Sequence, residues 1–89
     1  MTIEATIQIW REGRQFVAHA MPIDVISSGP TPDEAIAAVD EAVRLFVETA
    51  RDAGTLEDVL LECGYELRDD NWVSPEFVSL ERRRLAVAV

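Results

Sequence analysis

The sequence predicts a small α+β domain, in which one long amphipathic helix packs on a small antiparallel sheet in the order β-β-β-α-α-β. Three observations support this class. Alternating apolar residues precede position 22, a helical apolar stripe follows position 31, and short apolar runs separated by turn residues complete the chain. No linker, internal repeat or low-complexity segment interrupts the 89 residues. We therefore expect a single domain, residues 1–89.

The first part of the chain predicts three strands. Apolar residues at every second position from Ile3 to Ile9 indicate a half-buried strand. The polar segment Glu12–Gln15 contains a glycine and predicts a hairpin turn, after which residues 16–21 form the second strand. Pro22 interrupts this run, so residues 24–28 are expected to form a short third strand that is bent or at an edge.

The segment that follows predicts a long helix over residues 32–52. Thr31 and Glu34 have the spacing of a capping box, and Pro32 occupies the first helical position. Gly54 is a natural C-terminal stop. The apolar residues that recur at helical spacing are Ala35, Ile36, Val39, Val43, Phe46, Val47 and Ala50.

Beyond the long helix, the sequence predicts a short helix and further extended segments. Thr55 offers a new cap, and the apolar spacing up to Cys63 predicts a helix that ends at Gly64. Residues 65–67 are expected to begin a strand, and residues 69–71 to form a turn. The stretch from Trp72 to Pro75 is expected to be extended, because proline restricts its predecessor.

The tail combines a basic cluster with an apolar end. Leu85–Val89 is apolar and rich in valine, which predicts a strand paired within the sheet or across a dimer interface. Arg82, Arg83 and Arg84 form the only basic cluster, which taken alone is compatible with RNA or DNA contact. On a strand, however, the three side chains alternate between faces. Protection of an edge strand, or pairing with acids of another subunit, is the favoured interpretation.

The charge balance is strongly acidic. The net charge is −9, and residues 33–76 contain 13 acids against 3 arginines. Such a surface disfavours nucleic acid, because binding to phosphates depends on lysine and arginine. It favours a basic protein partner through electrostatic steering, although acidity that serves only solubility is an equal alternative.

Composition also indicates where such a chain would function. Its apolar runs are too short to cross a membrane, and its N-terminus lacks the pattern of a signal peptide. The single cysteine, Cys63, cannot form an internal disulfide, which suits a reducing compartment. We therefore expect a soluble, cytoplasmic domain. A chain of this length has a modest core, so a homodimer or higher homo-oligomer is expected to add stability.

No set of residues indicates catalysis. His19 is the only histidine and lies far from Cys63 in the sequence, so neither a zinc site nor a nucleophilic dyad is expected. Cys63 falls on the apolar stripe of the short helix and is interpreted as a small buried hydrophobe. The glycines form no phosphate-binding loop, and adjacent carboxylates on a helix do not face each other. We expect no enzyme activity, no metal and no cofactor.

The order of elements and several short motifs resemble the HicB family of antitoxins over residues 2–65. The residues that carry the resemblance are Gly29, Thr31, Glu34-Ala35, Glu41-Ala42, Glu48 and Cys63-Gly64-Tyr65. The Trp72–Pro75 stretch and the closing strand are similar to the end of short HicB-like chains. The resemblance implies a partly degraded ribonuclease-H-like fold without the acidic metal ligands of that enzyme.

Members of this family typically neutralise HicA, a small basic ribonuclease with a double-stranded-RNA-binding-like fold, by covering its active surface. The resemblance implies that function here, by occlusion of a HicA-like toxin. This chain differs from the common pattern of the family in two ways. Residues 20–24 replace the Pro-x-Leu-Pro-Gly loop that is frequent in the family, and the sequence shows no C-terminal DNA-binding motif, so direct DNA binding is not expected.

Candidate contact residues for such a partner are exposed acids of the long helix and one tryptophan. Asp40 with Arg44, and Glu48 with Arg51, have the spacing of ion pairs on the exposed helix face. Trp10 falls on the strand face opposite to the Ile3–Ile9 face, which is typical of a protein interface or of a second small core under a loop. The predicted contact residues are Asp33, Asp40, Glu41, Glu48 and Trp10.

Two other functions are open on the sequence alone. One is an orphan HicB-like fold that acts as an oligomeric adaptor or binds a small ligand, without a toxin. The other is residual nuclease activity, which requires clustered carboxylates that hold a divalent metal ion.

Overall fold

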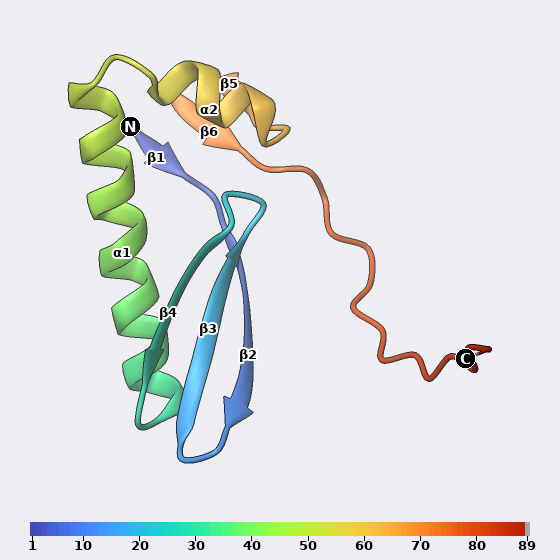
Figure 1. Cartoon of the computed structure of the whole chain (residues 1–89). Helices are drawn as coiled ribbons and strands as arrows, with labels where there is room; N and C mark the ends of the chain where they lie inside the picture. The colour runs from blue at the N-terminus through green and yellow to red at the C-terminus, as the bar shows by residue number, and fades with distance from the viewer. Residues whose placement is uncertain (89) are drawn as a thin grey trace.

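The computed structural model describes residues 1–88 and confirms the α+β class, with two helices and two three-stranded sheets (Figure 1). The elements in chain order are β1 (Thr2–Ile3), β2 (Thr6–Glu12), β3 (Gln15–Met21), β4 (Val25–Gly29), α1 (Pro32–Asp52), α2 (Leu56–Glu62), β5 (Glu66–Arg68) and β6 (Asn71–Val73). The expected single sheet is therefore wrong in its detail: the chain forms two sheets, and its order is β-β-β-β-α-α-β-β.

The larger sheet is the antiparallel meander β2-β3-β4. The predicted hairpin turn is confirmed at Gly13–Arg14, where Gly13 adopts a φ of 62° that favours glycine. In the register of β2 and β3, Ile9 is opposite Ala18 and Trp10 is opposite Val17. Because side chains alternate between the faces of a strand, Trp10 and Ile9 lie on opposite faces of this sheet.

The smaller sheet joins the two ends of the folded body. β1 pairs in parallel with β6, and β6 pairs with β5 across a turn at Asp69–Asp70, where both residues have positive φ. The predicted turn is thereby confirmed at Asp69–Asp70, whereas Asn71, which was expected in the turn, is the first residue of β6. The predicted strand over residues 3–9 is divided after Ile3, because its first part joins the smaller sheet.

Glu4 shows why the strand divides at that position. Its backbone N–H donates to the carbonyl oxygen of Trp72 at 3.0 Å, and its carbonyl oxygen accepts a hydrogen bond from Tyr65. The Glu4 carboxylate accepts the backbone N–H of Ser74 at 3.0 Å. Partners in the C-terminal part of the chain thus fix Glu4 beside β6, and the chain enters the larger sheet only at Thr6.

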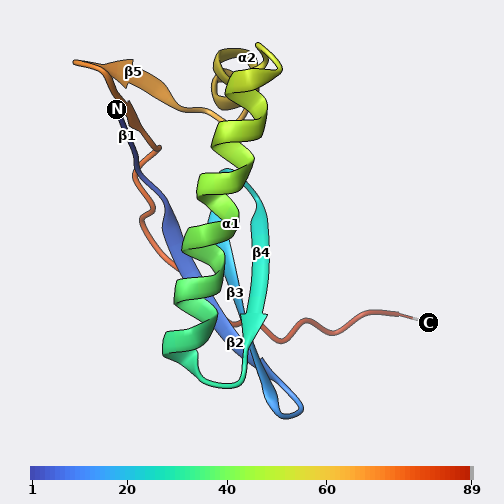
Figure 2. The same cartoon turned by 90° about the vertical axis from the view of Figure 1, so that its left-hand side faces the viewer.

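Helix α1 begins and ends as the sequence predicts. The Thr31 hydroxyl accepts the backbone N–H of Glu34 at 3.1 Å, and Pro32 occupies the first turn. The buried residues of α1 face β3 and β4, so the helix covers one face of the larger sheet along its length (Figure 2). Those buried residues are Ala35, Val39, Val43, Val47 and Ala50.

The core continues from this layer to α2 and β6. Leu60 of α2 is fully buried, and Tyr65 and Trp72 pack in the same cluster as Ala18 and Ala20. Cys63 packs against the cluster, but it is only half-buried rather than buried as predicted. Thr55, which was expected to cap α2, makes no capping hydrogen bond and donates its hydroxyl to the Ala50 carbonyl oxygen.

The tail differs most from its prediction. Residues 74–88 contain no strand. The first part of the tail passes the start of β2, where residues 77–80 line a cavity with Thr6–Gln8, and its end projects away from the folded body (Figure 1). Within the described residues, the predicted pairing of 85–89 inside the sheet is therefore wrong; its last residue, Val89, lies outside them. The Cα radius of gyration is 15.2 Å, against about 12 Å for a compact chain of this length. The projecting end of the tail accounts for the larger radius of gyration.

Candidate protein-interaction surface

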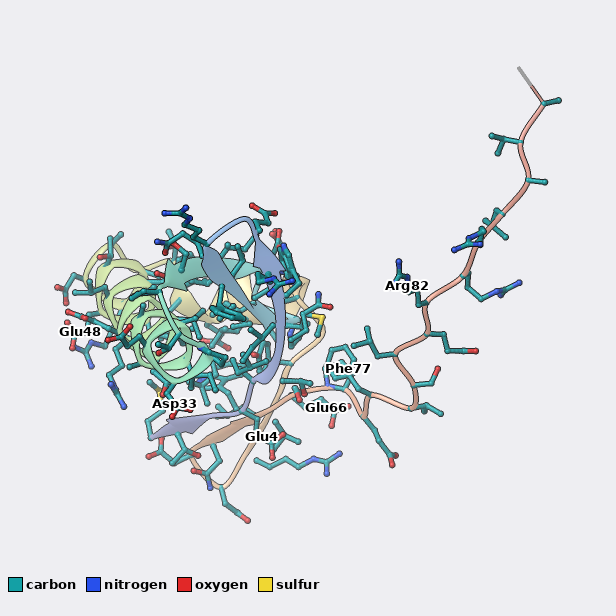
Figure 3. The ribbon with its side chains drawn as sticks, turned by 90° about the horizontal axis from the view of Figure 1, so that it is seen from below. Glu4, Asp33, Glu48, Glu66, Phe77 and Arg82 are labelled. Atoms are coloured by element: carbon teal, nitrogen blue, oxygen red, sulfur yellow. The ribbon has the colours of Figure 1, made fainter. Side chains whose placement is uncertain are left out.

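The predicted contact acids all lie on exposed positions of α1. The apolar stripe of the helix faces the sheet, so the charged residues occupy the remaining sides. Asp33 and Asp40 are seven residues apart, as are Glu41 and Glu48, and this spacing places the members of each pair on one side of the helix. Figure 3 shows Asp33 and Glu48 on the outside of α1.

These acids belong to a larger negative surface. Together α1 and α2 contain nine acidic residues and two arginines, and all nine acids are exposed. The expected pairs Asp40–Arg44 and Glu48–Arg51 are not formed among residues 1–88, where the only helix ion pair is Arg51–Asp52 at 4.0 Å. The carboxylates of α1 are thus open to a cationic partner.

Trp10 lies on a different surface. It shares a sheet face with Gln8 and His19, whereas α1 covers the face formed by Ile7, Ala18 and Ala20. Trp10 is 37% exposed, and its Nε1–H donates to the Glu12 carboxylate at 2.9 Å. Trp10 and the helix acids therefore occupy opposite sides of the larger sheet and do not form one patch.

The face around Trp10 carries a polar network that sequence reasoning missed. The His19 Nδ1 atom lies 2.8 Å from Nε2 of Gln8, and its Nε2 atom lies 2.6 Å from a carboxylate oxygen of Asp24. The rings of Trp10 and His19 meet edge to face, with centroids 6.3 Å apart. Asp24 reaches His19 because it adopts a positive φ of 64° in the turn before β4. Asp24 was expected in the third strand, whereas it lies in the turn after Pro22 and β4 begins at Val25.

This open face of the larger sheet, which we define by Trp10, Val17, His19 and Ile26, lies on the side away from α1 and is covered by neither helix of residues 1–88 (Figure 1). Ile26 is exposed and lies opposite His19 in the register of β3 and β4. On this face Trp10 and Ile26 are exposed, whereas the His19 imidazole between them is largely covered and Val17 is buried. The chemistry of this face suits contact with a protein or a small amphipathic ligand.

The geometry around the single cysteine gives no sign of a nucleophile. Burial raises the pKa of the Cys63 thiol above 9.0, and the negative charges of Glu62 and Asp24 act in the same direction. A raised pKa favours the protonated thiol, whereas nucleophilic chemistry needs the thiolate. Among residues 1–88 no three or more His, Cys, Asp or Glu side chains gather as metal ligands.

Comparison with known proteins gives no relative: no family model, no curated protein and no solved structure matches the chain. Across residues 1–88, neither helix combines the length and the apolar character that crossing a membrane requires.

Proposed function

We propose that this protein is a non-enzymatic, HicB-like antitoxin domain that binds a small basic ribonuclease of the HicA type and covers its active surface. The observation that carries the proposal is the set of exposed carboxylates on α1 that have no ion-pair partner across the helix. A protein that acts by occlusion needs a complementary surface and no catalytic group of its own.

Electrostatics give this surface two roles in binding. Exposed charges of one sign accelerate encounter with an oppositely charged protein and disfavour partners of the same sign. Glu41 and Glu48 lie near the middle of the solvent side of α1, opposite the buried stripe, where a flat basic surface can approach them. The HicB resemblance and the hairpin sheet under a long helix support the same class of function.

The chain offers a second candidate function, an orphan HicB-like oligomeric adaptor or small-ligand-binding domain. The observation that favours it is the open face of the larger sheet, where Trp10 and Ile26 are exposed beside His19. In this alternative Trp10 anchors the ligand or a neighbouring subunit, and the helix acids only maintain solubility.

Co-expression of the chain with the small basic protein encoded beside it separates the two functions. The antitoxin proposal predicts a stable complex in a pull-down and rescue of growth inhibition by the small protein. It also predicts that the double variant Glu41→Lys/Glu48→Lys loses rescue, because two charges change sign and the contact surface gains four units of positive charge.

The matched control is Glu57→Lys/Asp58→Lys on α2, which makes the same change in net charge on another helix. Rescue by this control, together with failure of the α1 variant, supports a contact on α1. Equal loss in both variants would indicate a bulk charge effect. A small protein that neither binds nor inhibits growth would overturn the antitoxin proposal and leave the adaptor.

A further inference from the structure

As far as position 88, the tail exposes apolar side chains on an extended backbone whose N–H groups from position 76 onward are unpaired. Leu85 is 70% exposed and Val87 is 76% exposed, and the larger residues at the start of the tail are exposed as well. Among residues 1–88, no backbone N–H from position 76 onward donates a hydrogen bond. An extended apolar segment of this kind is competent to add to the edge of a sheet.

The larger sheet offers a free edge. Its strand order is β2-β3-β4, so β2 pairs with β3 on one side only, and its other side is unpaired over Thr6–Glu12 within the described chain. Alternate residues of an edge strand direct their N–H and C=O groups outward. A seven-residue edge is long enough to receive the end of the tail.

A partly apolar groove lies beside this edge. It has a volume of about 270 Å³ and lies between α1 and the segment that runs from β1 to the start of β2. Its lining is aliphatic on the strand side, with Asp40 and Arg44 at its rim on the helix. Ile9, further along the same face of β2, is 37% exposed because α1 packs mainly on β3 and β4. The aliphatic lining consists of Ile3, Ala5, Ile7 and Val43.

The tail matches this edge in pattern and charge. On a strand, Arg83, Leu85 and Val87 share one face, and the small residues Ala86 and Ala88 lie on the other. A strand that turns Leu85 and Val87 toward the groove therefore brings an arginine to the same side as Asp40. Residues 1–75 contain 15 acids and 5 arginines, whereas residues 76–89 contain 2 acids and 3 arginines, so the two parts attract each other.

We propose that residues 82–88 of one copy add as a fourth strand to the outer edge of β2 in a second copy, with Leu85 and Val87 in the groove between β2 and α1. When two copies exchange tails, each tail covers the β2 edge of the other copy, and the apolar ends of both tails become buried. This surface shares Asp40 with the predicted contact acids but includes neither Glu41 nor Glu48, which test the toxin contact, and the inference does not rest on that function.

The position of the tail within its own chain favours a second copy over the same chain as the partner of residues 82–88. Residues 77–80 and the start of β2 at Thr6–Gln8 line a common cavity of about 340 Å³. The tail follows β6, which runs in the direction of β1, and then leaves the body (Figures 1 and 2).

Leu85 is five residues beyond Leu80, or about 17 Å at the rise of a strand. Glu12, the last residue of β2, is only four residues beyond Gln8. If Leu80 lies beside Gln8 and the tail continues along β2, Leu85 therefore lies past the end of that strand. Folding back would require a reversal within Glu81–Arg84, a segment that contains neither glycine nor proline.

The first test is the mass of the protein in solution, measured by sedimentation equilibrium on the full chain alone. We expect a dimer whose dissociation constant rises at least about tenfold in Leu85→Asp/Val87→Asp, because two buried apolar contacts are lost. The matched control Ala86→Asp/Ala88→Asp adds the same charge on the other strand face and is expected to remain a dimer. A monomeric wild-type chain, or equal weakening by both variants, would overturn the proposal.

The second test shows whether the tail binds in this groove. Asp40→Arg is expected to weaken the dimer, and Arg83→Asp in the same chain is expected to restore it, because the charge pair is re-formed with opposite signs. Nuclear Overhauser effects from the Leu85 and Val87 methyl groups are then measured in a mixture of two differently labelled copies. Contacts to Ile7 and Ile9 of the other copy support the exchange. Contacts within one copy only, or contacts to β4, would overturn it.

Discussion

The hydroxyl of Tyr65 donates a hydrogen bond of 2.6 Å to the backbone carbonyl oxygen of Glu4, 61 residues earlier in the chain. Tyr65 is buried in the core, while Glu4 lies at the point where the chain passes from the smaller sheet to the larger one. This contact ties the segment after α2 to the junction between β1 and β2. The contact helps to fix the position of the smaller sheet relative to the larger one.

Removal of this hydrogen bond should destabilise the fold. Tyr65→Phe preserves the packing of the ring but leaves the Glu4 carbonyl oxygen without its donor. We expect a loss of about 1 kcal/mol in the free energy of unfolding, the usual net value for such a bond. Urea denaturation followed by circular dichroism measures it. A stability equal to that of the wild type would show that water replaces the hydroxyl without cost.

The same residue predicts how stability depends on alkaline pH. Burial, with smaller effects from Cys63 and Glu4, raises the pKa of Tyr65 from 10.0 to about 12. The unfolded chain therefore loses this proton at lower pH than the folded chain, so the stabilisation is complete below pH 10 and is lost as the pH rises through 12. Urea denaturation across this range should show a decline that is smaller in Tyr65→Phe. Identical slopes in both proteins would contradict the raised pKa.

Gly29 is required by close approach between two backbones. A Cβ atom at this position would lie 2.8 Å from the backbone nitrogen of Ala35 and 2.9 Å from the carbonyl carbon of Glu34. Gly29→Ala therefore forces β4 and α1 apart, at an expected cost of about 3 kcal/mol. The control Gly13→Ala has open space around the new methyl group, and its positive φ costs only about 1 kcal/mol. Equal thermal destabilisation of the two variants would be evidence against the clash.

Two adjacent leucines of α2 provide a matched test of the core. Leu60 is 0% exposed and belongs to the core cluster, whereas Leu61 is 53% exposed. We expect Leu60→Ala to lower the free energy of unfolding by about 2–5 kcal/mol through cavity formation, and Leu61→Ala by about 0.5 kcal/mol or less. Both are measured by urea denaturation. A comparable loss in Leu61→Ala would mean that its side chain is covered in solution, for example by a second copy.

Local signals in the sequence were sufficient for the central elements. Thr31, Pro32 and the apolar stripe gave α1 its bounds, and Gly13 gave the hairpin its turn, because caps and turns depend on residues close together in the chain. The outward position of Trp10 also followed from the alternation of side chains between the two faces of a strand. All four predicted helix acids are exposed for the same reason, since they lie off the apolar stripe.

Contacts between distant residues were not predictable in this way. The parallel pairing of Ile3 with Trp72 joins positions that have no local signal for each other, so the second sheet was missed. The approach of Asp24 to His19 depends on the backbone of a turn, which the residue types alone do not specify. The apolar end of the tail predicted a strand that is not formed over residues 85–88, because a strand also needs an edge to pair with.

The central claim is that exposed carboxylates of α1 recognise a basic protein. The most direct measurement is calorimetric titration of the small basic protein encoded beside the chain into the wild type, Glu41→Lys/Glu48→Lys and Glu57→Lys/Asp58→Lys. We expect tight binding to the wild type and a dissociation constant that rises at least about tenfold only in the α1 variant. The affinity should also fall with added salt. Unchanged binding by the α1 variant, or no binding to the wild type, would contradict the account.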